Sequence, residues 1–162
     1  MLMVLLSMLA EELLMAFLGL EHSILNDKDE NTMKNTNLSD FEKIIIDTIL
    51  ENAKKQNPTL NILKLQFLNL SVQKRTYTNV GFFTDFQFKK NNLSLGRDIN
   101  MEIGSIHVEM ENLKFGAGFI LYIRNGLIAT LEGYCYDESW PRDERIKAIY
   151  KIKENGELEP IG

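Results

Sequence analysis

Apolar and polar residues alternate along much of the chain from Leu70 onward, and this period of two is typical of β-strands with one buried face. The alternation is clearest where Phe82, Thr84 and Phe86 fall on one side of a segment, and again at Ile106 and Val108. The pattern predicts strands at residues 70–78, 82–88, 106–111, 119–124, 127–136 and 146–153. We expect the last of these at an edge of the sheet, because its outward-facing lysines would discourage pairing with other chains.

The segment that precedes the strands has a helical period instead. Ser39 and Glu42 have the spacing of a capping box, in which each side chain bonds the backbone amide of the other residue at the start of a helix. Apolar residues then recur at helical spacing as far as Ala53. The Asn57-Pro58 pair predicts the end of this helix, since the residue before a proline avoids the helical region. Residues 59–68 fit a helix and a strand equally well, and we expect a short helix there.

The dipeptide Asn125-Gly126 predicts a tight hairpin, because a type I′ turn needs two residues that tolerate positive φ. In the resulting register Arg124 faces Leu127, and Tyr122 faces Ala129. Apolar residues fall on both faces of this hairpin, which predicts a place near the middle of a sheet that is covered at least partly on both sides.

Together these elements predict an α+β protein in which N-terminal helices pack on one face of a mostly antiparallel sheet of five or six strands, linked largely as a meander. Residues 38–162 are expected to form a single domain, since a chain of 162 residues can bury a core without disulfides. Residues 1–37 are expected to form an apolar helix and a polar linker that the domain does not require.

The segment Met1–Leu20 is almost entirely apolar, and Glu11 and Glu12 interrupt it. It has three interpretations: a helix that packs on the domain or on a partner, an upstream extension of the reading frame, and a membrane contact. Membrane contact is disfavoured, because a carboxylate at the centre of a bilayer costs about 2.5–3.5 kcal/mol on insertion scales and two are present.

Composition and charge argue against several classes of function. The chain has 18 basic and 23 acidic residues, a net charge of −5 and no long basic run, which disfavours nucleic-acid binding. The single cysteine, Cys135, is compatible with a reducing, cytoplasmic setting. Two histidines offer little material for a zinc site or a catalytic triad, so we expect no cofactor or metal.

A few side chains are candidates for chemistry. His107, Glu109 and Glu111 share one strand face, which is typical of a solvated surface but also suits a polar cleft. A small-ligand site or a hydrolase-like enzyme would use His107 and Glu109 together with Asp85 and Glu132.

A glycine-rich segment and the single cysteine both have simpler explanations than ligand binding or catalysis. The segment Gly116-Ala117-Gly118 precedes a strand rather than a helix, so a tight turn explains it better than a dinucleotide loop. Cys135 is expected to be a small buried residue rather than a nucleophile.

Aromatic residues supply a second candidate surface. Trp140 follows Tyr134 and Tyr136 closely in the sequence, and the three rings together would form a contact surface for a protein partner. Alternatively, Trp140 folds back to cap the core.

Several short motifs occur in sequence: Arg75-Thr76-Tyr77-Thr78, Gly81-Phe82-Phe83-Thr84-Asp85-Phe86, Gly116-Ala117-Gly118-Phe119, Asn125-Gly126, Leu131-Glu132-Gly133-Tyr134 and Trp140-Pro141. From Leu38 to Pro141 the chain resembles a family of small uncharacterised bacterial proteins with such glycine-aromatic motifs. The resemblance implies a bacterial, cytoplasmic, single-domain protein, and it implies no activity, cofactor or catalytic residue. Because the sequence shows no nucleophile with a base, no metal-ligand set and no phosphate loop, we expect a protein-binding or regulatory module without catalysis, comparable to bacterial immunity proteins. Its contact surface is expected to be acidic and aromatic, near Glu109, Glu111 and Trp140.

Overall fold

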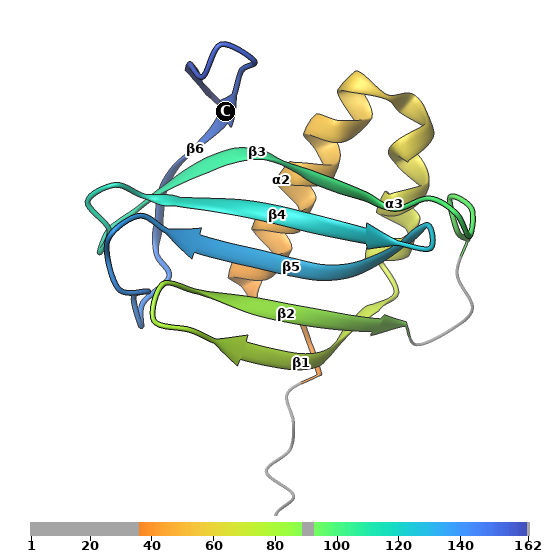
Figure 1. Ribbon diagram of the computed structural model, residues 1–162, viewed down its shortest axis with the longest axis horizontal. Coiled ribbons are helices and arrows are strands. Elements are labelled where there is room, and N and C mark those ends of the chain that lie inside the picture. The colour runs from red at the N-terminus through yellow and green to blue at the C-terminus, as the bar shows by residue number, and fades with distance from the viewer. Residues whose placement is uncertain (1–35, 89–92, 162) are drawn as a thin grey trace, which may run out of the picture. The chain divides into compact units, whose positions relative to one another are not determined.

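A computed structural model describes residues 36–88 and 93–161. In this part of the chain two α-helices pack on one face of an antiparallel sheet (Figure 1), so the predicted α+β class is confirmed. The predicted apolar helix at Met1–Leu20 and nearly all of the predicted linker lie outside the described residues. The boundary at residue 37 therefore stays a prediction.

Helix α2 (Asp40–Gln56) begins and ends where the sequence predicted. The Ser39 hydroxyl accepts a hydrogen bond from the Glu42 amide at 3.1 Å, and the Glu42 carboxylate accepts one from the Ser39 amide at 2.7 Å. Beyond Asn57 the 3₁₀ turn η1 (Pro58–Leu60) leads into α3 (Asn61–Phe67), so the short helix predicted at 59–68 is also confirmed.

The sheet of the described chain has seven strands, and every neighbouring pair is antiparallel in the order β1-β2-β5-β4-β3-β6-β7. The strands are β1 (Leu70–Tyr77), β2 (Gly81–Phe88), β3 (Met101–Met110), β4 (Ala117–Arg124), β5 (Leu127–Cys135), β6 (Ile146–Ile152) and β7 (Leu158–Pro160). The central meander β3–β4–β5 lies between the hairpins β1–β2 and β6–β7, so β5 returns beside β2 and β6 returns beside β3. Four of the six connections between the described strands join neighbouring strands and two do not, so the predicted meander is interrupted at the β2–β3 and β5–β6 connections.

The strand count and the edge assignment also need correction. The described sheet has one strand more than the five or six predicted. The strand that was missed is β7, which is only three residues long and therefore too short to show a period in the sequence. Because β7 pairs with β6, the strand predicted at 146–153 is inside the sheet and not at its edge.

The hairpin between β4 and β5 confirms the predicted turn but not the whole register. Asn125 and Gly126 have φ values of 52° and 73°, and Arg124 faces Leu127. Tyr122 faces Thr130 rather than Ala129, because a bulge leaves one extra residue on β5. The extra residue lets both Ile128 and Leu131 face the core, which a strict alternation would not allow.

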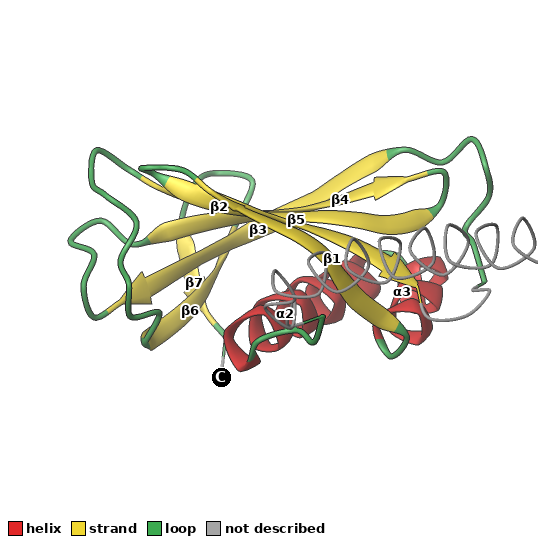
Figure 2. Ribbon diagram, turned by 90° about the horizontal axis from the view of Figure 1, so that it is seen from below, coloured by secondary structure: helices red, strands yellow, loops and turns green. Residues whose placement is uncertain are grey.

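The core lies between the helices and the sheet face toward them (Figure 2). On α2, Ile45, Ile46, Ile49 and Leu50 are almost completely buried, and they pack with the alternate buried residues of the strands. No described helix covers the opposite face, so among the described residues the predicted two-sided cover of the central hairpin is one-sided.

Candidate functional site on the open face of the sheet

The sheet face opposite α2 and α3, called here the open face, carries the side chains that alternate with the core residues. The Cα register aligns these side chains in rows across neighbouring strands. Three rows cross the centre of the sheet: Tyr134, Gly118, His107 and Tyr150; Phe83, Glu132 and Ile120; and Asp85, Thr130, Tyr122 and Glu102.

Two glycines make room for rings on the open face. A Cβ atom at Gly118 would lie 2.6 Å from the hydroxyl oxygen of Tyr134, so only glycine lets the Tyr134 ring lie across β4. A Cβ atom at Gly116, whose φ is +69°, would lie 2.7 Å from the His107 ring. The Gly116-Ala117-Gly118 segment is thus a turn followed by a close ring contact, as its position before a strand indicated.

Hydrogen bonds fix the next side chains along the open face. The Tyr122 hydroxyl donates to the Glu132 carboxylate at 2.6 Å, and the Thr130 hydroxyl donates to the Asp85 carboxylate at 2.8 Å. All of these residues except Glu132 border a hollow of about 400 Å³, lined by Thr76, Phe83, Asp85, Tyr122, Arg124 and Thr130.

Two tyrosines of the open face, Tyr122 and Tyr134, are neutral donors rather than bases. The hydrogen bond to Glu132, together with burial and the charge of that carboxylate, raises the pKa of Tyr122 to about 12. Burial and a hydrogen bond with Tyr136 raise the pKa of Tyr134 to about 12. The rings of Tyr134 and Tyr136 meet edge to face, with centroids 5.6 Å apart. Both hydroxyls stay protonated at neutral pH, an arrangement suited to holding a partner.

The four residues proposed for a polar cleft all lie on the open face, but each carboxylate has a different partner. Asp85 is bound by Thr130, Glu132 by Tyr122, and Glu109 by the hydroxyl of Tyr150. The His107 ring lies 6.3 Å from the ring of Tyr150, centroid to centroid. Only Asp85 of the four lines the hollow.

Trp140 does not join the tyrosines. Its ring lies 5.1 Å from Phe82, 6.1 Å from Phe119 and 6.5 Å from Phe41, all on the helix-covered side of the sheet. Its indole N–H donates to Glu144 at 3.1 Å. Trp140 therefore caps the core, and the single surface of Trp140, Tyr134 and Tyr136 does not form, because β5 alternates and sends Tyr134 to the other face.

Two other candidates are not part of the three rows of the open face. Glu111 follows the end of β3 and pairs with Arg145 at 2.9 Å. Cys135 is buried, its sulfur lies 3.2 Å from the carbonyl oxygens of Val80 and Glu138, and burial raises the pKa of its thiol. These contacts describe an unreactive thiol.

Sequence reasoning missed three aromatic residues of the open face: Phe83, Tyr122 and Tyr150. Strand alternation alone sends Phe83 away from the core, because Phe82 and Thr84 are buried on either side of it. An aromatic residue at an outward strand position is the signal that would have identified it. The outward direction expected for the lysines of its strand implies an inward Tyr150, and its true direction follows only from its pairing with His107.

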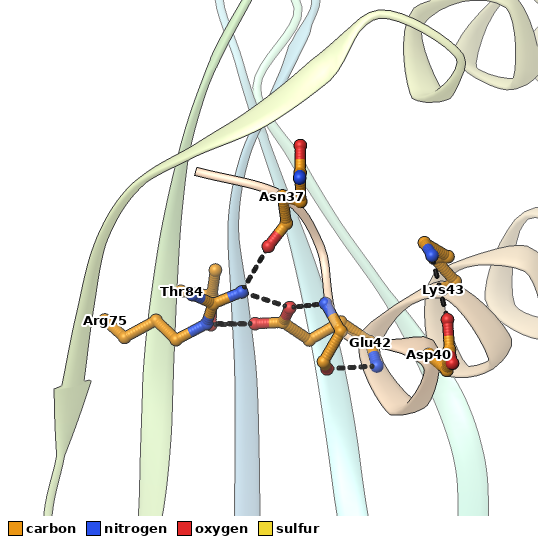
Figure 3. A network of polar contacts seen from close by, with 7 residues as sticks. Asn37, Asp40, Glu42, Lys43, Arg75 and Thr84 are labelled. Carbon is orange, nitrogen blue, oxygen red and sulfur yellow. Dashed lines mark hydrogen bonds and ion pairs between the residues drawn. The ribbon is translucent and has the colours of Figure 1, made fainter. Parts of the chain in front are cut away.

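Several motif residues meet instead on the covered face, in a polar network at the start of α2 (Figure 3). Arg75 donates to both oxygens of Glu42, at 2.9 and 2.7 Å, and also to the Asn37 carbonyl at 2.8 Å. Thr84 donates to Glu42 at 2.7 Å. Glu42 is only 3% exposed, so this network ties α2 to β1 and β2 and has a structural role.

Comparisons with family models, curated proteins and solved structures find no significant match. Within the described ranges, no group of three or more histidine, cysteine or carboxylate side chains is placed to hold a metal ion. No helix in that part of the chain combines the length and the apolar character needed to cross a bilayer.

Proposed function

We propose that the protein binds another protein through the open face and catalyses no reaction, in the manner of small regulatory or immunity proteins. We place it in the bacterial cytoplasm, on the resemblance of its motifs and its single cysteine. The observation that carries the proposal is a set of fixed, partly exposed aromatic rings on a sheet face that no described helix covers.

The rings suit recognition of a protein surface. Tyr122, Tyr134 and Tyr150 are half-buried, Phe83 lies beside them, and Tyr136 is 42% exposed. The hydrogen bonds of the tyrosines, and the space that Gly118 leaves for the Tyr134 ring, fix the rings before binding. Little side-chain entropy is therefore lost when a partner covers the rings. Aromatic residues of this kind commonly contribute most of the binding energy of an interface.

Charge indicates the chemistry of the partner. The open face has the acidic residues Asp85, Glu102, Glu109 and Glu132, and the basic residues Lys74 and Arg124. Arg124 is paired with Glu102 at 3.5 Å, and Lys74 lies opposite Asp85 in the register. Glu109 and Glu132 therefore retain uncompensated charge, which favours a partner with a basic contact surface.

The test uses the full chain as bait in extracts of its own source. One variant combines Glu109→Lys with Tyr136→Ala, and a matched control combines Glu154→Lys with Leu68→Ala, two exposed positions away from the open face. We expect the unmodified protein and the control to capture the same basic protein in stoichiometric amount. With that partner purified, the open-face variant should bind about 10–100-fold more weakly by calorimetry.

Equal binding by both variants would overturn the proposal, as would the absence of any stoichiometric partner. Turnover of a small molecule that His107→Ala abolishes would support the enzymatic alternative instead.

A further inference from the structure

A second hollow lies on the covered side, between the last two turns of α2 and strands β3 and β6. Its volume is about 250 Å³. Apolar side chains form most of its wall: Ile49, Ala53, Leu60, Met101, Ile103 and Ile106. Its size lies below the ~300–1,000 Å³ of sites for drug-sized molecules, so it suits a smaller ligand.

One polar atom beside this hollow lacks a hydrogen-bond partner among the described residues. The side-chain nitrogen of Asn52 is buried, and no acceptor among the described residues bonds it. Asn52 lines the hollow. Buried donors in proteins are nearly always paired, because an unpaired one loses its hydrogen bonds to water without replacement. A ligand acceptor inside the hollow would restore that bond.

A cation stands at the same site. Lys151 lines the hollow and also a neighbouring polar crevice that Gln56, Glu154 and Glu159 border, so it lies where the two meet. No carboxylate of the described residues forms an ion pair with Lys151. Glu102 also lines the hollow, but its charge is paired with Arg124.

We propose that this hollow binds a small molecule with an apolar body and one carboxylate group. The apolar body packs against Ile49, Met101 and Ile106, while the carboxylate accepts hydrogen bonds from Asn52 and Lys151. The site is independent of the open face, because it is on the opposite side of the sheet.

Octanoate is a suitable probe, with the full-length protein and isothermal titration calorimetry as the measurement. We expect saturable one-to-one binding, with the side-chain amide resonances of Asn52 shifting in nuclear magnetic resonance spectra. Lys151→Gln should weaken binding about tenfold, because a charge-assisted hydrogen bond is lost. The control Lys147→Gln, at an exposed position of the same strand that does not line the hollow, should leave binding unchanged.

Asn52→Leu should abolish binding by removing the donor and filling the space, and a thermal melt establishes that this variant is folded. Octanol has the same apolar chain without the carboxylate, so it tests whether the chain alone accounts for binding. Octylamine carries a donor instead of an acceptor, so it tests whether the Asn52 amide is turned the other way and presents its oxygen. Binding of either compound as tightly as octanoate would overturn the proposal. Failure of octanoate to saturate, or equal weakening by Lys151→Gln and Lys147→Gln, would overturn it as well.

Discussion

Helix α2 has a buried polar group near each end, and the two groups are in opposite situations. Near the start, Glu42 accepts hydrogen bonds from Arg75, from Thr84 and from the Ser39 amide. Near the end, the buried amide nitrogen of Asn52 has no acceptor within the described structure. The first group fixes the helix to the sheet, whereas the second is an unsatisfied donor on a residue that lines a hollow.

The difference shows that the burial of a polar group does not by itself reveal its role, and that its hydrogen-bond partners must be known as well. A buried charge that is fully bonded belongs to the framework, because its partners come from three separate elements and hold them in one arrangement. A buried donor without a partner indicates a place that a ligand can complete. The following predictions test the two ends of α2 against each other.

Glu42→Ala should have the largest effect, a loss of about 3–5 kcal/mol in the free energy of unfolding, because it removes the carboxylate that compensates a partly buried charge. That charge belongs to Arg75, whose side chain is only 21% exposed. Urea denaturation measures the change. The control Asp40→Ala removes a carboxylate that is 94% exposed in its pair with Lys43, and it should change stability by less than about 1 kcal/mol. Equal effects of the two substitutions would contradict a framework role for Glu42.

Acid should remove part of the same stability. Burial alone would raise the pKa of Glu42, but hydrogen bonds from Arg75, the Ser39 amide and Thr84 outweigh it and hold the pKa below its ordinary value of 4.5. The stability that the carboxylate contributes is therefore present above that value and lost as the pH falls through the lower, folded-state pKa.

Denaturation of the unmodified protein and of Glu42→Gln, repeated from neutral pH downward, measures this loss. The difference in free energy of unfolding between the two proteins should be smaller than the difference caused by Glu42→Ala, and it should disappear in acid. A gap that does not change with pH would show that Glu42 is not ionised in the folded protein.

Thr84→Val should cost about 1–2 kcal/mol, because it removes one donor to a buried carboxylate and keeps the side-chain shape. Thermal unfolding compares this variant with Thr76→Val, a strand position exposed to water, which should change stability by less than about 0.5 kcal/mol. If both substitutions were neutral, the hydroxyl of Thr84 would not contribute to the network.

Asn52→Leu should have the smallest effect and the opposite sign, a gain of about 1 kcal/mol, because a buried unpaired donor is replaced by an apolar group. The matched control Lys55→Leu, at an exposed position of the same helix, should stay within about 0.5 kcal/mol of the unmodified protein. A net loss of stability in Asn52→Leu would mean that the amide already has a partner in the folded chain.

Features set by neighbouring residues could be predicted from the sequence. The capping box depends on Ser39 and Glu42 alone, and the turn at Asn125-Gly126 depends on two residues that tolerate positive φ. The bulge beside Ala129 could not be predicted, because only the pairing with Tyr122 and Ile123 reveals the extra residue.

The same limit applies to the sites. Arg75 and Glu42 are 33 residues apart and meet only because β1 lies beside the start of α2. Trp140 was near the predicted tyrosines in sequence, but the alternation of β5 places Tyr134 on the other side of the sheet from the Trp140 ring. His107 and Glu109 were predicted as neighbours on one face because residues two apart on a strand always are.

The strand order has a consequence for the time course of folding. Strands β3, β4 and β5 follow one another through short connections. The pairing of β2 with β5, and of β3 with β6, instead closes a long loop of intervening chain. Closing such stretches costs entropy before any contact is gained. We therefore expect the central meander to form in the folding transition state and both outer hairpins to dock later. Substitutions in β4 should then slow refolding, while those in β1 and β7 should mainly speed unfolding.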